Sequence, residues 1–180
     1  MSASTAHVRI STLVTAEQID ARVREIAGLI SHDHAGTELL VIGVLKGSWV
    51  FLADLVRQVT IPLLVNFVAV SSYGDGTYSS GSVKLLMEPD CEVEGRDILV
   101  VDDILDTGLT LKFVMDRIRH RRPHSLKLCV LLDKPQRRQV EIKPDYVGFR
   151  IPDRFVVGYG LDHNQRFRNL PFIGYISQTE

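Results

Sequence analysis

Hydrophobic positions recur at helical spacing in three stretches of the chain. The first stretch begins after Thr15, which together with Gln18 has the spacing of a capping box, the side-chain pair that starts many helices. Its apolar face is formed by Ile19, Val23, Ile26, Ala27 and Ile30. Residues 49–56 and residues 109–119 carry the second and third patterns. The spacing therefore predicts three helices with one buried face each.

Short continuous apolar runs lie between and after these helical stretches. They cover residues 39–45, 63–70 (apolar except for Asn66), 98–101, 126–132, 146–149 and 155–159. Unbroken runs of this length are typical of strands that are buried on both faces of a parallel sheet. Strands that alternate with helices predict an α/β domain with a mainly parallel sheet, whose ligands gather at the carboxyl ends of the strands.

The composition adds limits to this picture. A length of 180 residues fits one domain with a small flap, and 45% hydrophobic and 24% charged residues are typical of a soluble globular protein. The formal charge of −1 argues against bulk binding to polyanions, so any anion site requires local clustering. No signal-peptide pattern and no apolar run of about 20 residues is present, so we expect a cytoplasmic protein without membrane attachment.

Two cysteines and six histidines offer little chemistry. Cys91 and Cys129 are far apart and fit neither a disulfide framework nor a zinc motif. The histidines are scattered, and the nearest pair, His32 and His34, has no partner at the spacing of a zinc site. We therefore expect reduced thiols and no histidine-based metal site.

Residues 98–111 carry the clearest chemical signal. An apolar strand delivers Asp102 and Asp103 to its end, and a short turn then opens the helix at 109–119. The first amides of a helix have no partner within the helix and can hold a phosphate. Gly108 can adopt a positive φ or let an anion approach, and Thr107 and Thr110 offer hydroxyl donors.

The two acids suit a different part of such a ligand. Carboxylates accept hydrogen bonds from vicinal hydroxyls and bind magnesium, so Asp102 and Asp103 fit a ribose and a Mg²⁺ ion. The alternative is that both acids only cap a helix and that Gly108 is only a turn residue, because capping uses the same residue types.

The whole string resembles the phosphoribosyl pyrophosphate motif of type I phosphoribosyltransferases, which is a hydrophobic strand, two acids, two apolar residues and Asp-Thr-Gly. The resemblance implies that family's fold, a mainly parallel sheet flanked by helices, with a small hood built from the N-terminal and C-terminal segments of a single domain at 1–180. It also implies a 5′-phosphate site that extends over Asp106, Thr107, Gly108, Leu109 and Thr110.

Further segments resemble the hypoxanthine-guanine branch of that family. Residues 45–48 are similar to its pyrophosphate loop, which implies that Lys46 and Gly47 face the leaving pyrophosphate and that the peptide bond between them can be cis. Arg168 is similar to the family arginine that contacts pyrophosphate, and a guanidinium suits that task. The neighbouring Arg166 could exchange roles with it.

The purine side of the resemblance lies further along the chain. Lys134 is similar to the lysine that donates to the exocyclic oxygen of the purine. In residues 155–162 the resemblance implies that Phe155 stacks on the purine, that the Val156 backbone binds its edge, and that Asp162 helps to hold a second Mg²⁺. Considered without the resemblance, Phe155 and Tyr159 would be core aromatics of a strand.

Residues 71–82 are too polar and too rich in glycine and serine to pack, and predict a loop. By resemblance this is the flexible loop, begun by Ser72 and Tyr73, that closes over the site and excludes water during the reaction.

The resemblance implies a magnesium-dependent purine salvage enzyme that joins hypoxanthine or guanine to phosphoribosyl pyrophosphate, with Asp106 as the general base. Many members of this branch have Glu-Asp where this chain has Asp102-Asp103. The pair Asp-Asp also occurs in xanthine-guanine enzymes, so xanthine remains a possible substrate.

Two other functions stay open at this point. Some proteins of this fold are RNA-binding regulators, and residues 117–124 form a basic cluster. The cluster also fits the end of a helix, where cations complement the helix dipole, so we expect no nucleic-acid partner. A phosphoribosyltransferase for adenine or a pyrimidine is the second alternative. Family members associate as dimers or tetramers, and Trp49 with its helix is a candidate for the interface.

Overall fold

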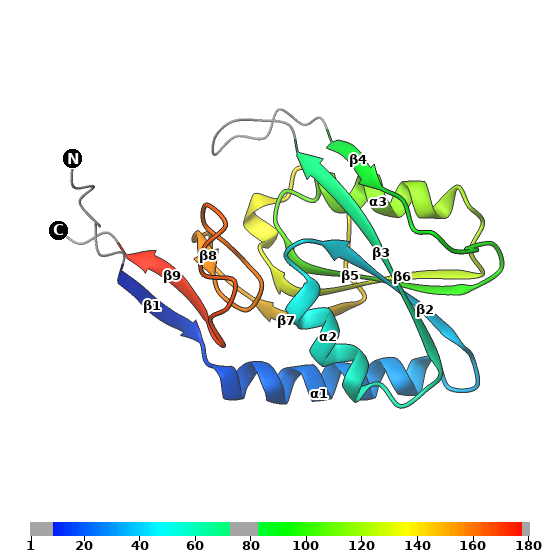
Figure 1. The fold of residues 1–180 in the computed structure, drawn as a ribbon, viewed down its shortest axis with the longest axis horizontal. Coiled ribbons are helices and arrows are strands. Elements are labelled where there is room, and N and C mark those ends of the chain that lie inside the picture. Colours follow the sequence, from blue (N-terminus) through cyan, green and yellow to red (C-terminus); the bar gives the residue numbers. More distant parts are fainter. Residues whose placement is uncertain (1–8, 73–82, 178–180) are drawn as a thin grey trace.

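The computed structural model describes residues 9–72 and 83–177 of the chain (Figure 1). The elements follow one another as β1 (Arg9–Val14), α1 (Ala16–Asp33), β2 (Leu39–Leu45), α2 (Trp49–Gln58), β3 (Leu63–Ser72), β4 (Val83–Met87), β5 (Asp97–Leu105), α3 (Leu109–Arg119), β6 (Ser125–Asp133), the 3₁₀ turn η1 (Pro135–Arg137), β7 (Tyr146–Arg150), β8 (Val156–Val157) and β9 (Ile173–Ser177). Strands and helices alternate through most of the chain, as the apolar patterns predict.

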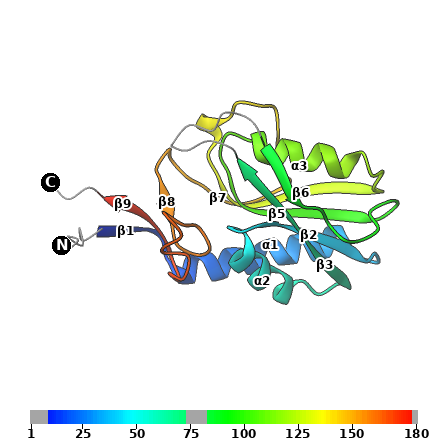
Figure 2. The ribbon, with the colours of Figure 1, turned by 45° about the horizontal axis from the view of Figure 1, so that its top comes forward.

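The main sheet has six strands in the order β4-β3-β2-β5-β6-β7. All neighbours in it are parallel except β4, which is antiparallel to β3 at one edge. Alternate residues of the central strands pack into two separate cores: one includes α1 and α2, and the other includes α3. Figure 2 shows α3 on one side of the sheet and the two other helices on the opposite side. The prediction of a mainly parallel sheet flanked by helices is confirmed.

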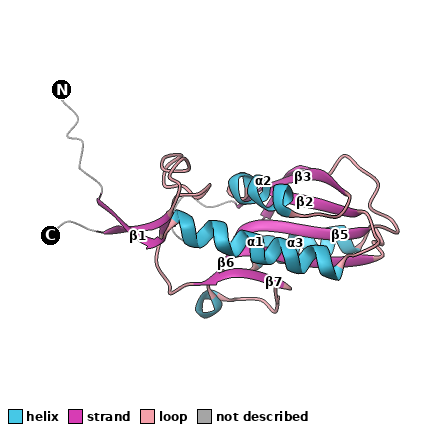
Figure 3. Cartoon of the chain, turned by 90° about the horizontal axis from the view of Figure 1, so that it is seen from below, coloured by secondary structure: helices cyan, strands magenta, loops and turns pink. Residues whose placement is uncertain are grey.

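A second, smaller sheet joins the two ends of the described chain. It has the order β1-β9-β8 and is antiparallel throughout. Its register pairs Arg9 with Ser177 at one end and Val157 with Gly174 at the other. In Figures 1 and 3 this sheet stands beyond the end of the main sheet. Like the hood that the resemblance implies, it is built from the N-terminal and C-terminal segments.

The three predicted helices are confirmed. Thr15 Oγ1 accepts a hydrogen bond from Gln18 N (3.3 Å), and the Gln18 side chain accepts one from Thr15 N (2.9 Å), so the capping box is formed. The predicted apolar face of α1 is buried. The helix α3 has the predicted bounds, and α2 extends two residues beyond the predicted end, to Gln58.

Three expectations about strand ends were wrong. β5 does not stop before its acids but continues to Leu105, because Asp102 still pairs with Val130 of the neighbouring strand. Ser72 and the residue before it belong to β3, where β4 extends the pairing, and so do not lie in a loop. Of residues 155–159, only 156 and 157 form a strand. Tyr73 and the rest of the predicted loop lie outside the described residues.

No helix among residues 9–72 and 83–177 is long and apolar enough to cross a membrane. Cys91 and Cys129 are both free thiols, as expected, and Cys129 is buried on β6.

Candidate active site

The predicted functional residues come together at the carboxyl ends of neighbouring parallel strands. Lys46 and Gly47 follow β2, the acidic segment closes β5, and Lys134 follows β6. These three strands include two directly paired couples, β2 with β5 and β5 with β6. Because the strands run in one direction, their ends meet at a single edge of the sheet, the usual location of ligand sites in α/β folds.

The turn after β5 forms a small hollow. Gly108 has a φ of +87° and is the N-cap residue of α3, and a side chain there would collide with Ile142 and Val140. The hollow at this turn has a volume of about 200 Å³ and is lined by residues 102–108, Thr110 and Leu111. A left-handed glycine and the free amides of a helix start are suited to an anion such as phosphate.

The two acids are adjacent and largely withdrawn from water. Asp102 is 7% exposed, and its Oδ1 accepts a hydrogen bond from Asp103 N at 2.9 Å. Burial, and then the charge of Asp103, raise the pKa of Asp102 well above its usual value. Burial also raises the pKa of Asp103, against the opposing effects of hydrogen bonds and of the Arg168 charge. A buried and a half-buried carboxyl group with this electrostatic cost fit a divalent cation that would neutralise them.

The turn after β2 packs directly on the acids. A Cβ atom at Gly47 would overlap the Asp103 carboxylate, so only glycine fits this position. The structure has one cis peptide bond among its described residues, and it joins Leu45 to Lys46. The expectation of a cis bond between Lys46 and Gly47 was therefore wrong by one residue.

Arg168 reaches the same region from the C-terminal loop. Its Nη1 donates to the Gly160 carbonyl at 2.7 Å, and its Nη2 lies 2.6 Å from Asp162 Oδ1. Asp162 also accepts a hydrogen bond from Gln165 N at 2.8 Å. Arg166 is exposed and Arg168 is half-buried, and the assignment of the pyrophosphate contact to Arg168 stays a prediction.

Asp162 does not join Asp102 and Asp103 in one metal-binding group. Among residues 9–72 and 83–177, no three His, Cys, Asp or Glu side chains gather closely enough to hold an ion by themselves. A metal at this site would need ligands from a bound molecule as well, such as phosphate or hydroxyl oxygens.

Lys134 lies in a group of four charges that includes Asp106 of the turn after β5. It is 5% exposed, and its Nζ lies 4.0 Å from Asp106 Oδ2 and 3.9 Å from Asp153 Oδ1. Arg137 completes the group, since its Nε donates to Asp106 Oδ1 at 3.0 Å and its Nη1 lies 3.5 Å from Asp153 Oδ2. The sequence reasoning missed Arg137 and Asp153, and nearness to Lys134 in the chain was the only available signal for Arg137.

Phe155 is 56% exposed, and its ring meets His163 edge to face at a centroid distance of 5.3 Å. It is therefore not the core aromatic that the strand pattern alone favoured. Val156, the next residue, is buried in β8. An open aromatic face beside a fixed backbone is suited to stacking against a flat ring.

The basic cluster at residues 117–124 is largely neutralised within the chain. Arg117 pairs with Glu88, Arg119 with Asp116, and His124 Nδ1 lies 2.8 Å from Asp97 Oδ1. The cluster closes α3, which supports its interpretation as the cationic end of a helix.

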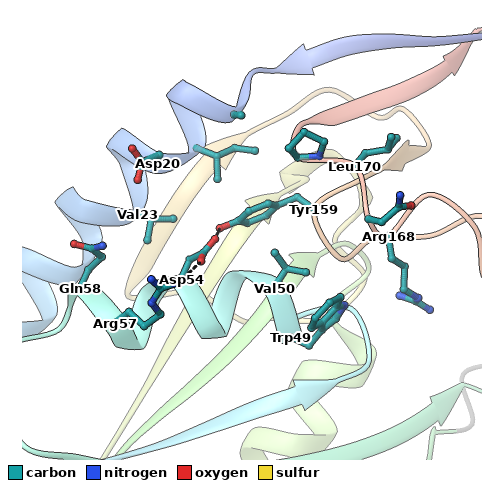
Figure 4. A pocket seen from close by; sticks show the side chains of 14 residues that line it. Asp20, Val23, Trp49, Val50, Asp54, Arg57, Gln58, Tyr159, Arg168 and Leu170 are labelled. Atoms are coloured by element: carbon teal, nitrogen blue, oxygen red, sulfur yellow. Dashed lines mark hydrogen bonds and ion pairs between the residues drawn. The ribbon is translucent and has the colours of Figure 1, made fainter.

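A larger cavity, of about 610 Å³, lies beside α2 (Figure 4). It is lined by residues of α1, α2 and the loop at 168–171. Trp49 and Tyr159 stand in its wall, and Arg168 connects it to the site described above.

Comparison with known proteins agrees with this geometry. Residues 10–164 match the family described as the phosphoribosyl transferase domain. The chain is 48% identical over 164 residues to a hypoxanthine-guanine phosphoribosyltransferase of Bacillus subtilis, which covers 91% of both chains. It is 43% identical over 169 residues to a hypoxanthine phosphoribosyltransferase of Salmonella typhimurium, covering 93% of this chain and 95% of the relative.

Solved structures give the same result. A hypoxanthine-guanine phosphoribosyltransferase of Bacillus anthracis superposes with a TM-score of 0.90 at 46% identity, over 95% of this chain and 100% of that one. A hypoxanthine phosphoribosyltransferase of Staphylococcus aureus gives 0.89 at 41% identity, over 93% and 91%. The chain therefore belongs to the hypoxanthine-guanine phosphoribosyltransferase family.

Proposed function

We propose that this protein is a purine salvage enzyme that transfers the 5-phosphoribosyl group from phosphoribosyl pyrophosphate to hypoxanthine or guanine, giving IMP or GMP and pyrophosphate. The observation that carries the proposal is the meeting of three structures at one edge of the sheet. These are the acid pair at the end of β5, the hollow at Gly108, and the charged group around Lys134.

The phosphorylated sugar would be bound by the two turns that follow β2 and β5. The turn at residues 106–110 holds the 5′-phosphate through amides and hydroxyls, and Asp102 and Asp103 accept hydrogen bonds from the ribose hydroxyls. The acid pair, and Asp162 at a second position, would hold Mg²⁺, which supplies positive charge to the pyrophosphate as it leaves. Lys46 and Arg168 add their own positive charges on the pyrophosphate side.

The purine would lie between Phe155 and the Lys134 group. The Lys134 ammonium, already held by two carboxylates, donates to the exocyclic oxygen of the base. The ring stacks on Phe155, and the Val156 backbone binds its edge. A carbonyl-bearing purine suits this arrangement better than adenine, because an ammonium has only donors to offer.

In the reaction, a purine ring nitrogen forms a bond to the anomeric carbon of the ribose while the bond from that carbon to pyrophosphate breaks. The proton of the purine passes to the Asp106 carboxylate. The protein contributes mainly alignment of the two reactants and charge stabilisation of the leaving group. Arg137 and Lys134 both contact the Asp106 carboxylate, which supports the proposal because these contacts would fix its direction.

We expect Asp106→Asn to lower turnover by roughly 10² to 10⁴ fold, because an amide cannot accept the proton. Binding of phosphoribosyl pyrophosphate should be unchanged, since the 5′-phosphate is held mainly by the amides of the turn. Steady-state kinetics and calorimetric binding measure the two effects. Asp116→Asn, at an acid on the surface of α3, serves as the control. Turnover equal to that of the wild type would remove Asp106 from the role of base.

The substrate is tested directly with a panel of bases. Purified protein is incubated with phosphoribosyl pyrophosphate, Mg²⁺ and each of hypoxanthine, guanine, xanthine, adenine and uracil, and the nucleotides are separated and identified. We expect products from hypoxanthine and guanine, and competition between the bases measures the preference for xanthine. The proposal would be overturned if only adenine or uracil gave a nucleotide, or if none of the bases did. Omission of Mg²⁺ should abolish the reaction.

We further propose that the protein acts in the cytoplasm as a homodimer or homotetramer. Several large apolar side chains are exposed on α2 and on the strands at one edge of the main sheet: Trp49, Leu64, Val65, Phe67, Leu86 and Met87. Exposed apolar groups of this size are typical of a surface that contacts another subunit.

A further inference from the structure

The turn between the purine-side strand β8 and Asp162 has an uncommon backbone. Gly158, Tyr159 and Gly160 all have positive φ, at 98°, 51° and 100°. For tyrosine this conformation is unfavourable, so it persists only where surrounding contacts hold it. Cβ atoms at the two glycines would overlap the Phe172 carbonyl and the Gly47 carbonyl respectively, so the turn is wedged between the C-terminal loop and the loop after β2.

The Tyr159 side chain connects this turn to α2 through a hydrogen bond. The Tyr159 hydroxyl donates a hydrogen bond to Asp54 Oδ2 at 2.7 Å, and Tyr159 is only 6% exposed. Figure 4 shows the tyrosine ring reaching across the cavity wall to Asp54 of α2. Because α2 begins directly after Lys46, Gly47 and their serine neighbour, the bond joins the C-terminal loop to the helix that carries the pyrophosphate loop.

The turn at residues 158–160 is in direct contact with the groups assigned to pyrophosphate. Gly160 N donates to the Arg168 carbonyl at 3.0 Å, and the Arg168 guanidinium donates back to the Gly160 carbonyl at 2.7 Å. On its other side Gly160 packs on Gly47, which packs on Asp103. A contact path therefore runs from Asp54 through the turn to both sides of the pyrophosphate site.

We propose that Tyr159 and Asp54 are positioning residues for pyrophosphate: their hydrogen bond fixes Arg168 and the Lys46-Gly47 loop at the spacing that the diphosphate requires. This inference rests on the proposed function. Neither residue touches the reacting atoms, and both act through Gly160. Burial, and then the bond to Asp54, raise the pKa of Tyr159, so its hydroxyl stays protonated and remains a donor at neutral pH.

The chain contains a closely matched bond far from the site. The Tyr146 hydroxyl also donates to an aspartate, Asp33 Oδ2, at 2.7 Å, and Tyr146 is 5% exposed. It begins β7, so it lies at the amino ends of the parallel strands, opposite the edge that carries the site. Tyr146→Phe therefore removes a similar bond and tests for effects that are merely structural.

The experiment compares Tyr159→Phe, Asp54→Ala, their double variant and Tyr146→Phe with the wild type. Calorimetry measures the binding of magnesium pyrophosphate, and kinetics give separate KM values for phosphoribosyl pyrophosphate and for the purine. We expect the first three variants to bind magnesium pyrophosphate about tenfold more weakly, the scale of one hydrogen bond to a charged group, with a similar rise in KM for phosphoribosyl pyrophosphate. The KM for the purine should stay within about twofold of the wild type.

The double variant should be no weaker than either single variant, because both substitutions remove the same bond. Tyr146→Phe should lower the melting temperature without changing pyrophosphate binding. Wild-type pyrophosphate affinity in Tyr159→Phe and Asp54→Ala, or an equal loss in Tyr146→Phe, would overturn the inference. If Tyr159→Phe does not fold, Asp54→Ala alone decides. A wild-type protein that forms no nucleotide would instead refute the proposed function.

Discussion

At Asp102 and Asp103, withdrawal from water and the proposed binding role favour opposite protonation states. Burial favours the neutral acid, as the raised pKa of Asp102 shows, while the proposed role in binding ribose and Mg²⁺ requires the carboxylate. In the proposed role, the protein would hold a charge that its fold disfavours until a cation neutralises it. This conflict is typical of functional sites, where local stability is lower than a better packed or neutral arrangement would give.

The conflict predicts a pH-dependent change in stability. The pKa of Asp102 is higher in the folded than in the unfolded protein, so its contribution to stability is present at low pH and is lost as the pH rises through the folded pKa. Asp102→Asn should therefore increase the free energy of unfolding at pH 8 without Mg²⁺, with a smaller gain near pH 4. Urea denaturation at the two pH values measures the difference.

Asp116→Asn gives a control of opposite sign. Hydrogen bonding from Lys112 lowers the pKa of Asp116, so this carboxylate stabilises the fold above its unfolded pKa, and its removal should cost a little stability at pH 8. Mg²⁺ should stabilise the wild type more than Asp102→Asn. An Asp102→Asn protein that is less stable than the wild type at pH 8 would contradict this account.

At the scale of elements, α1 depends on its first turn. Its capping box satisfies backbone amides that have no partner within the helix. Thr15→Ala should lower the free energy of unfolding by about 1 kcal/mol, whereas Thr15→Gly should cost only a few tenths. Chemical denaturation measures both, and pyrophosphate binding should stay unchanged. Equal stability of Thr15→Ala and the wild type would show that the cap contributes nothing.

The elements that sequence reasoning predicted are those with a strong local pattern. The three helices and the buried parallel strands follow from spacing and from continuous apolar runs. β1, β4 and β9 were not predicted, because they are short, partly exposed strands that are defined by their partners. β1 pairs with β9 at the other end of the described chain, and β4 pairs with β3, the strand just before it. The continuation of β5 through its acids has the same origin, since β6 supplies the partners.

The site residues also fall into those that a local pattern predicts and those that depend on the fold. The residues of the local motif, from Asp102 to Thr110, could be proposed from their order alone. Arg137 and Asp153 could not, because their roles come from distances to Asp106 and Lys134 that only the fold creates. The bond between Tyr159 and Asp54 joins residues 105 positions apart and leaves no trace in any local pattern.

At the scale of the molecule, the exposed apolar groups near α2 predict association. Trp49 is 51% exposed, and so is Leu29 on α1, which provides a matched control. A buried interface tryptophan contributes about 2 kcal/mol or more, so Trp49→Glu should raise the subunit dissociation constant roughly thirtyfold or more. Glutamate is compatible with the first turn of a helix, so the fold should be retained.

Sedimentation equilibrium measures the association of the wild type, Trp49→Glu and Leu29→Glu. We expect a dimer or tetramer for the wild type and for Leu29→Glu, and a shift toward monomer for Trp49→Glu. A wild type that is monomeric at every concentration would refute the proposed assembly.

The pairing of β1 with β9 connects the first described strand to the segment proposed to bind the purine. β9 lies between β1 and β8, and β8 contains Val156 and follows Phe155. Proteolytic removal of residues 9–14 would leave β9 with an unpaired edge. The small sheet that holds β8 beside the proposed purine site would then lose one of its three strands. Loss of this N-terminal strand would thus weaken binding of the purine near the C-terminus, although none of the lost residues belongs to the proposed purine site.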